Sequence, residues 1–463
     1  MNRGINQTID DFVNQTRDVI YLREIDRLLI IRPNKIHHVN DSAFHILNLL
    51  YAENNTSSET EMKYKDIYSL SIEKAQRDVF LITDTLKSLL QEDYKNAQSV
   101  GIIPFDPSSI TYPVLSEIAL TYRCNNSCEF CYASSPYRDT PEMTTDDVKV
   151  IIEKIHNDAH VPTISFTGGE PTLRKDLPHL INHASKLGMR TNLITNGTLL
   201  TEELVENLHE CGLNSAQVSL ESHIGDIHNE IVGNRTAFEK TIEGIHFLKS
   251  TGIHVHTNTT INLKNRDHLI PLVDFIKYEF DFPYLSMNMI IKTGTAQEND
   301  NQNVSYSTIE DIVKPVIEHC NKKDMKFVWY SPTPYCLFNP VDYDLGSKSC
   351  ACVSGLLSVN PRGDILPCSS YDKGIGSLLK KDFQKLWNSD EALYYRDRRY
   401  VPPVCTKCEY EVLCGGACPL YWEHAGSFKE IENCQNKDPF FKNMIWKIEK
   451  KIRISAKGIS GRF

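Results

Sequence analysis

Three closely spaced cysteines constrain this chain more than any other feature of its sequence. Cys124, Cys128 and Cys131 have the spacing C-x3-C-x2-C and follow an apolar, strand-like stretch. The chain has 14 cysteines among 463 residues, and its first residues lack the apolar segment of a secretory signal. Because the cytosol keeps thiols reduced, we expect the cysteines to bind metal or to take part in catalysis, not to form disulfides.

The spacing of the triplet favours an iron–sulfur cluster. Three thiolates on a cubane cluster leave one iron open, and an open iron can bind a small chelating substrate. A structural zinc site normally takes four ligands from paired short spacings. The alternative is that these are incidental or buried cysteines.

Composition and charge narrow the class of protein. Hydrophobic residues make up 41% and charged residues 24%, which predicts folded domains because a disordered chain is much less apolar. The sequence has no apolar run long enough to span a membrane. Its net charge of -10 has no long basic stripe. We therefore expect a cytoplasmic protein that binds neither nucleic acid nor membrane.

The central part of the chain, 114–335, alternates strands with helices. This order predicts an α/β fold, a partial (β/α)6 barrel of the TIM type, in which the loops after the strands carry the chemistry. The expected strands span 115–122, 163–167, 190–195, 216–220, 254–261 and 284–290.

Two further regions flank this barrel. Residues 1–100 predict a hairpin over 17–33, a helix after Asn40-Asp41-Ser42 and another from Ser69 or Ser71, with 54–61 as a solvated connector. Residues 101–113 read as a linker. Residues 336–440 hold nine of the cysteines, as in a small domain stabilised by metal sites, and 441–463 predict one closing helix.

Motifs after the first four strands resemble the radical S-adenosylmethionine (radical SAM) superfamily over most of 114–300. The cysteine triplet follows the first strand and Gly168-Gly169-Glu170-Pro171 the second. Thr195-Asn196-Gly197 follows the third strand and Ser219-Leu220-Glu221 the fourth.

The resemblance implies a mechanism and a set of residues. Cys124, Cys128 and Cys131 would hold a [4Fe–4S] cluster whose open iron binds S-adenosylmethionine (SAM), and reductive cleavage would give a 5′-deoxyadenosyl radical. Phe130 would shield the cluster, Tyr132 would lie near the adenine, and Glu170 would contact the methionyl ammonium. The remaining cofactor contacts implied are Gly168, Gly169, Asn196, Ser219 and Glu221.

One position departs from the family pattern. Relatives with an H-D-x-x-R-G sequence after the fourth strand use its arginine for the SAM carboxylate, whereas Val232 stands there in this chain. Arg235 is a substitute by sequence, and a solvated loop arginine is the alternative.

The second group of cysteines resembles the SPASM extension, which binds auxiliary iron–sulfur clusters. Its eight cysteines suffice for two such clusters. The family pattern implies Cys350, Cys352, Cys368 and Cys418 for the first and Cys405, Cys408, Cys414 and Cys434 for the second. The short Cys350–Cys352 spacing leaves Cys336, or an open iron, as alternatives for the first cluster. A zinc ribbon is the alternative for 405–418, and Cys211 and Cys320 are expected to be core thiols.

The N-terminal region resembles the winged-helix PQQ peptide chaperone, which binds a leader peptide along the edge of its hairpin. A degenerate domain kept for packing is the alternative. The three domains together resemble maturases of ribosomally made peptides, which form thioether or carbon–carbon crosslinks or epimerise residues. This resemblance implies a leader-bearing peptide substrate and an electron donor such as flavodoxin or ferredoxin.

Two other functions remain open from the sequence. The same core and SPASM arrangement also serves haem or other cofactor biosynthesis and sulfatase maturation. A zinc- or redox-responsive regulator whose winged helix binds DNA is an alternative of another class, against which the lack of a basic patch counts.

Overall fold

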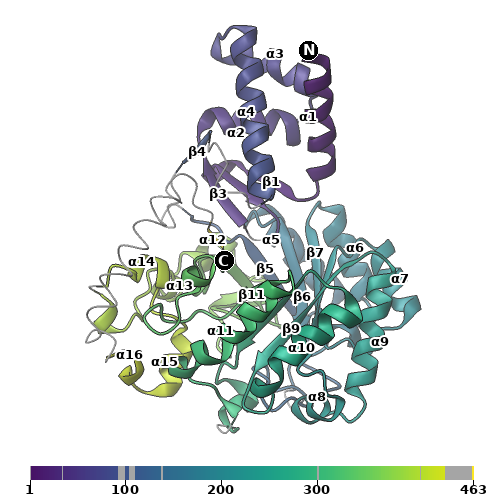
Figure 1. Ribbon diagram of the computed structural model, residues 1–463, viewed down its shortest axis with the longest axis vertical. Helices are drawn as coiled ribbons and strands as arrows, with labels where there is room; N and C mark the ends of the chain where they lie inside the picture. The colour runs from purple at the N-terminus through teal and green to yellow at the C-terminus, as the bar shows by residue number, and fades with distance from the viewer. Residues whose placement is uncertain are drawn as a thin grey trace. The chain divides into compact units, whose positions relative to one another are not determined.

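The computed structural model describes residues 2–33, 35–91, 100–103, 110–136, 139–299, 302–406, 408–432 and 461–462. The chain forms two compact units, whose main parts are Met1–Thr111 and Tyr112–Asn436. Figure 1 shows the helices and strands of each.

The N-terminal unit is an antiparallel sheet with four helices. The strands β1, β2 and β3 pair in sequence order, and β3 also pairs with β4 and β15. The strands span Ile20–Arg23 (β1), Leu28–Ile31 (β2), Lys35–Val39 (β3), Ile102–Ile103 (β4) and Gly461–Arg462 (β15), and the helices Asn2–Thr16 (α1), Asp41–Tyr51 (α2), Ser57–Tyr68 (α3) and Ile72–Leu90 (α4).

Side-chain caps explain where these helices begin. Asn40 accepts a hydrogen bond from the Ala43 amide at the start of α2, and Ser71 caps α4, as the sequence predicts. The connector expected over 54–61 is wrong, because Thr56 and Glu59 form a capping box that begins α3. The helix α1 was not anticipated.

The larger unit is built on a ten-stranded sheet in the order β11-β10-β9-β8-β7-β6-β5-β12-β13-β14. The strands from β5 to β11 are all parallel. They span Leu115–Thr121 (β5), Thr163–Gly168 (β6), Arg190–Thr195 (β7), Ser215–Ser219 (β8), His254–Ile261 (β9), Tyr284–Met289 (β10) and Lys326–Trp329 (β11).

This order confirms the partial α/β barrel. Neighbouring parallel strands that follow one another in sequence need right-handed crossovers of one sense, so their helices cover one face of the sheet. Figure 1 shows α6, α7, α9 and α10 along that side. The crossover helices are Thr145–Asn157 (α5), Leu177–Lys186 (α6), Glu202–Glu210 (α7), Gly225–Val232 (α8), Ala237–Ser250 (α9), Leu269–Phe275 (α10) and Tyr306–Lys322 (α11).

The structure extends the predicted six-stranded barrel at both edges. The strand β11 adds a seventh parallel strand, which the sequence analysis did not list. At the other edge, β12 (Leu356–Val359) pairs in parallel with β5, and β13 (Asp364–Leu366) and β14 (Gly376–Ser377) follow in antiparallel order. The cysteine-rich part of the chain therefore continues the barrel sheet.

The two faces of this sheet differ in chemistry. On the helix-covered face, side chains such as Phe166 and Leu193 are fully buried in the hydrophobic core. On the opposite face, which we call the inner face, the alternate residues Ser165, Asn192 and Gln217 are polar and partly exposed. Strand alternation thus separates an apolar core from a polar, solvent-accessible surface.

Short helices complete the cysteine-rich region: Phe383–Trp387 (α12), Asp390–Arg396 (α13), Glu411–Cys414 (α14), Pro419–Ala425 (α15) and Lys429–Glu432 (α16). The closing helix expected over 441–463 falls outside the described residues, apart from Gly461–Arg462, which form β15. Among the helices that the structure describes, none is both long and apolar enough to cross a membrane.

A buried histidine makes the N-terminal unit sensitive to acid. His37 on β3 is fully buried, neither ring nitrogen has a hydrogen-bond partner, and burial lowers its pKa from 6.5 to about 3. Between those values the unfolded chain binds the proton and the folded chain does not, so stability falls as the pH drops below 6.5.

We expect His37 to make the free energy of unfolding about 2 kcal/mol lower at pH 5 than at pH 7. His37→Leu should remove that part of the pH dependence and should also stabilise the unit at pH 7, because no unpaired polar atom is then buried. Urea denaturation of both proteins at the two pH values measures the difference. Equal pH dependence in the two proteins would contradict the assignment.

Candidate functional site

The predicted functional residues gather where the parallel strands end. The cysteine loop follows β5, and the loops after β6, β7, β8 and β10 bond to it. Thr121 and Arg123 accept backbone hydrogen bonds from Gly169 (2.8 Å) and Glu170 (2.9 Å). The Ser127 amide donates to the Val232 carbonyl at 3.0 Å, and the Thr295 amide donates to the Cys131 carbonyl at 3.0 Å.

Two glycines allow the loop after β6 to approach the cysteine loop. A Cβ atom on Gly168, which has a φ of 134°, would lie 2.1 Å from the Thr121 carbonyl oxygen. A Cβ atom on Gly169 would lie 2.3 Å from the Arg123 carbonyl oxygen. Any side chain at either position would therefore push the two loops apart.

The three thiols of the triplet lie side by side. Burial, and after it the charge of neighbouring acidic groups that include the other thiols, raises the pKa of Cys124 to about 11 and that of Cys128 well above its usual range. The Asn126 amide and the Asn196 side-chain amide donate to the Cys124 sulfur at 3.4 Å and 3.8 Å. Such contacts favour a sulfur that carries negative charge, as it does when bound to iron.

The arrangement fits a cluster better than a single ion. In the described parts of the chain, no three His, Cys, Asp or Glu side chains are grouped as ligands of one metal ion. Tetrahedral zinc needs its ligands to meet at one point, whereas an iron–sulfur cluster takes its thiolates on different irons. Three neighbouring, partly exposed thiols on one loop meet the second requirement.

Glu170 lies at the centre of the hydrogen bonds between the loops. Its Oε1 accepts from the Thr172 amide, the Thr172 hydroxyl and the Thr195 hydroxyl, at 3.0, 2.6 and 2.8 Å. Its Oε2 accepts from the Asn196 amide at 2.8 Å. Oε1 already has three donors and Oε2 has only one, so the predicted contact with an ammonium group would fall on Oε2.

Glu221 is a second buried carboxyl at this edge. Its Oε2 accepts from the Thr260 amide at 2.8 Å, and burial raises its pKa to about 8. Its own amide donates to His228 Nδ1 at 3.1 Å, and burial lowers the pKa of His228 to about 4. His228 therefore orients the backbone at Glu221 as a neutral ring.

The other predicted residues of this site have different surroundings. Phe130 and Ser219 are partly exposed. The Tyr132 hydroxyl hydrogen-bonds to Thr167 near the partly buried Glu117. Arg235, the substitute considered for the missing family arginine, is exposed.

The structure also brings together four cysteines of the second group. The Cys352 thiol hydrogen-bonds with the thiols of Cys350 and Cys368. Burial raises the pKa of Cys418, and the nearby Cys350 and Cys368 also raise it. The close Cys350–Cys352 spacing thus does not prevent the two thiols from joining one set. Cys336 packs partly buried against the hydrophobic core.

Tyrosines that the sequence pattern did not indicate surround this set. The Cys418 amide donates to the Tyr306 hydroxyl at 3.3 Å, and Tyr400 hydrogen-bonds to Cys350. No local sequence pattern indicates these contacts, because Tyr306 belongs to α11 and the cysteines to the region after the barrel.

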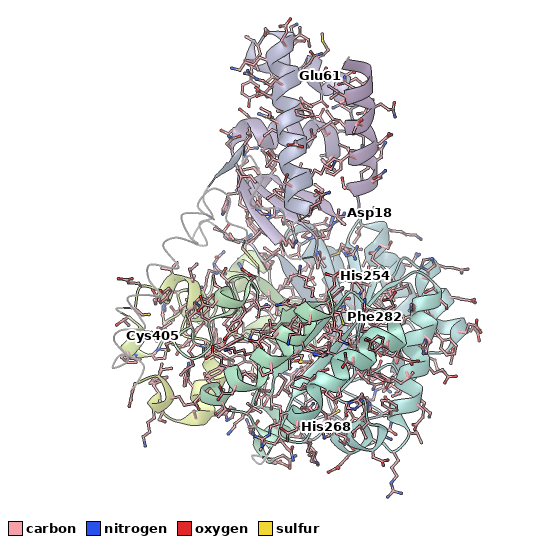
Figure 2. The ribbon with its side chains drawn as sticks, viewed as in Figure 1. Asp18, Glu61, His254, His268, Phe282 and Cys405 are labelled. Carbon is pink, nitrogen blue, oxygen red and sulfur yellow. The ribbon has the colours of Figure 1, made fainter. Side chains whose placement is uncertain are left out.

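Cys405, Cys408 and Cys414 lie on two consecutive turns, with the Cys408 amide donating to the Cys405 carbonyl at 2.9 Å. Figure 2 labels Cys405. The Tyr335 amide donates to the Cys414 sulfur at 3.5 Å. Cys434, the fourth predicted member, lies outside the described residues. Of the two cysteines expected to be core thiols, Cys320 is fully buried, whereas Cys211 is partly buried.

Comparison with protein families identifies the two domains. Residues 118–276 match the radical SAM superfamily, and residues 350–409 match the iron–sulfur cluster-binding domain named SPASM. The chain therefore contains a radical SAM domain and a SPASM domain, and these domains imply SAM and iron–sulfur clusters as its cofactors. They favour an enzyme over the regulator given above as an alternative.

Relatives of the chain differ in their reactions. It is 26% identical to an AdoMet-dependent heme synthase of Oleidesulfovibrio alaskensis, over 66% of this chain and 83% of that protein. It is also 26% identical to a PqqA peptide cyclase of Bradyrhizobium diazoefficiens, over 76% of this chain and 89% of that protein.

Solved structures share the fold at lower identity. Streptococcus suis SuiB bound to its precursor peptide SuiA superposes with a TM-score of 0.65 at 16% identity, over 88% of this chain and 95% of SuiB. The enzyme anSMEcpe with bound AdoMet and a peptide gives a TM-score of 0.53 at 19% identity, over 70% and 99% of the two chains.

We expect Gly169→Ala to lower SAM cleavage at least about tenfold, because the new Cβ would displace the Arg123 carbonyl that anchors the cysteine loop. The measurement is 5′-deoxyadenosine formed by reconstituted protein with dithionite. Gly4→Ala is the matched control, since nothing lies within 4 Å of its added Cβ. A wild-type rate in Gly169→Ala would show that the close approach is not needed.

Proposed function

We propose that this enzyme modifies a side chain of a ribosomally made peptide, forming a thioether or carbon–carbon crosslink or epimerising a residue. Two observations, one in each unit, carry the proposal: the N-terminal sheet has an edge strand with a single neighbour, and the barrel sheet has a polar, solvent-accessible inner face. Cys124, Cys128 and Cys131 hold the SAM-binding [4Fe–4S] cluster. Phe130, Tyr132, Gly168, Gly169, Glu170, Asn196, Ser219 and Glu221 surround the cofactor. The protein acts in the cytoplasm.

The eight later cysteines hold two auxiliary clusters. The close approach of Cys350, Cys352, Cys368 and Cys418 supports the first set. The second set is Cys405, Cys408, Cys414 and Cys434. A flavodoxin or ferredoxin supplies electrons to the enzyme.

The residues of the site position the cysteine loop and the cofactor relative to one another. When bound, SAM and its cluster supply a 5′-deoxyadenosyl radical that removes a substrate hydrogen. Glu170 holds the loops after β6 and β7 together and offers its remaining lone pair to the methionyl ammonium. Asn196 donates to the Cys124 sulfur and orients the cysteine loop.

The N-terminal unit, residues 1–100, supplies the leader-binding surface. Among the strands that the structure describes, β1 has a single neighbour, β2, whereas β3 pairs with β2, β4 and β15. The Val19 carbonyl accepts from the Arg32 amide across the two strands. In an antiparallel pair every second residue bonds to the partner strand, so the backbone N–H and C=O groups of Ile20 and Leu22 point away from β2. A leader strand can pair with them.

The second candidate is haem or another cofactor biosynthesis, and the heme synthase relatives favour it. The third candidate is sulfatase maturation, and it is supported only by the barrel and SPASM arrangement that such enzymes share with this chain. Coexpression with short open reading frames flanking the gene, followed by mass spectrometry, separates these functions. A crosslink removes two hydrogens from a peptide, whereas epimerisation in D2O adds one deuterium. Conversion of Fe-coproporphyrin III without any peptide change would favour the second candidate.

We expect the triple variant Cys124→Ala/Cys128→Ala/Cys131→Ala to lose SAM cleavage and to keep the auxiliary clusters. Reconstituted wild type should contain about twelve irons and the variant about eight. Iron and labile-sulfide analysis, with a 5′-deoxyadenosine assay, measures both effects. Zinc in place of iron, or nucleoside formed by the variant, would overturn the assignment.

Deletion of residues 1–100 should weaken peptide turnover without stopping 5′-deoxyadenosine formation in the absence of peptide. The reason is that the leader-binding edge and the cysteine loop belong to separate compact units. Parallel assays of peptide product and nucleoside test this separation. Equal loss of both activities would argue against a recognition domain.

A further inference from the structure

Arg398 links the two sets of cysteines that follow the barrel. It lies two residues after α13, and its Nη1 donates to the carbonyls of Glu411 and Val412 at 3.0 and 2.7 Å. Both carbonyls belong to α14, the turn that ends at a cysteine of the second set, and Figure 1 shows α13 and α14 next to one another. Its Nη2 lies 3.5 Å from the Oγ atom of Ser349, the residue before Cys350. One guanidinium thus contacts the segments that carry a member of each set.

The local backbone is shaped around this side chain. Arg398 has a φ of 54°, in the left-handed region that residues other than glycine rarely adopt. A Cβ atom on Gly415, which has a φ of 64°, would lie 3.0 Å from Cζ of Arg398. A strained backbone conformation persists only where its surroundings hold it, and the contacts of the guanidinium supply that support here.

Arg398 has no carboxylate partner among the residues that the structure describes. Its partners are two carbonyl oxygens and one hydroxyl, and the residue is partly buried. The neighbouring Arg399 is exposed and pairs with Asp390 and Asp397 at 2.9 Å each. Because a partly buried cation costs free energy unless a negative group compensates it, Arg398 requires another source of negative charge.

The first cysteine set lies close enough to supply this charge. The pKa of Cys350 is lowered first by the hydrogen bond from Cys352, and the charge of Arg398 and a hydrogen bond from Tyr400 lower it further. Burial raises the pKa of Cys352 and Cys418 well above the usual value. Arg398 therefore favours the thiolate at Cys350, the form in which a cysteine binds iron.

A cation in this place also acts on the cluster that the four thiols would hold. A cluster bound by four thiolates is negative in both oxidation states, and reduction adds one more negative charge. A nearby positive charge therefore stabilises the reduced form more than the oxidised form. Burial of the site limits the screening of this charge by water and salt.

We propose that the charge of Arg398 raises the reduction potential of the auxiliary cluster held by the first set, Cys350, Cys352, Cys368 and Cys418. Arg398 acts through the cluster and is a positioning residue, whose contacts with α14 fix where its charge lies relative to Cys350. The inference rests on the proposed auxiliary clusters and goes beyond them, because it assigns a function to a residue that binds no iron.

Redox titration of the reconstituted full-length protein, followed by electron paramagnetic resonance of the reduced clusters, measures the effect. Arg398→Gln removes the charge and keeps an amide donor for α14, whereas Arg398→Lys keeps the charge. At the wild-type midpoint potential, we expect the ratio of reduced to oxidised cluster to be about tenfold lower in Arg398→Gln, which equals about 59 mV for a one-electron couple. In Arg398→Lys the ratio should stay within about twofold of the wild type, because the charge remains.

Arg399→Gln is the matched control, since it removes the same charge one residue away, where water and two carboxylates already screen it. Its ratio should stay within about twofold of the wild type. The potential of the SAM-binding cluster should be unchanged in all three variants. An unchanged ratio in Arg398→Gln, or an equal decrease in Arg398→Lys, in Arg399→Gln or at the SAM-binding cluster, would overturn the proposal.

Iron analysis decides the result if a variant loses its cluster. Loss of about four irons from Arg398→Gln but not from Arg398→Lys would show that the cluster itself needs the charge, and this would support the proposal. The same loss from both variants would show that the guanidinium only anchors α14, which would overturn it. Wild type with only the SAM-binding cluster would overturn the auxiliary clusters together with this inference. Equal potentials in proteins with about twelve irons would overturn this inference alone.

Discussion

The structure depends on one constraint, the single hand of the crossovers between neighbouring parallel strands. Because β5 to β11 follow one another in order, every crossover helix covers the same face and every strand ends at the same edge. The hydrophobic core forms under the helices, and the inner face is left for polar side chains. Both the shared edge that carries the cysteine loop and the polar inner face follow from this order.

At the cofactor edge, backbone contacts matter as much as the cysteines themselves. The loop after β6 reaches the cysteine loop only because Gly168 and Gly169 lack side chains. Glu170 then ties that loop to the one after β7 through the Thr195 hydroxyl and the Asn196 amide. A loop with three closely spaced thiols requires this support, since three side chains on a short loop do not define their own geometry.

The sequence predicted elements where local chemistry determines them. Asn40 and Ser71 begin helices through caps that involve only neighbouring residues. The helix α3 was missed because its polar sequence lacks a clear apolar face, although its capping box was present. The strand β11 was missed because four residues give too little alternation to distinguish a strand from the end of a helix.

The sequence by itself determined the spacing of the cysteines, the motifs at the strand ends and the alternation of strands with helices in the barrel, because each depends on residues close together in the chain. Tertiary structure alone decided that Cys418 joins Cys350, Cys352 and Cys368, and that Tyr306 of α11 contacts this set. Those properties arise from groups on distant segments that folding brings within hydrogen-bonding distance, and no local pattern encodes them.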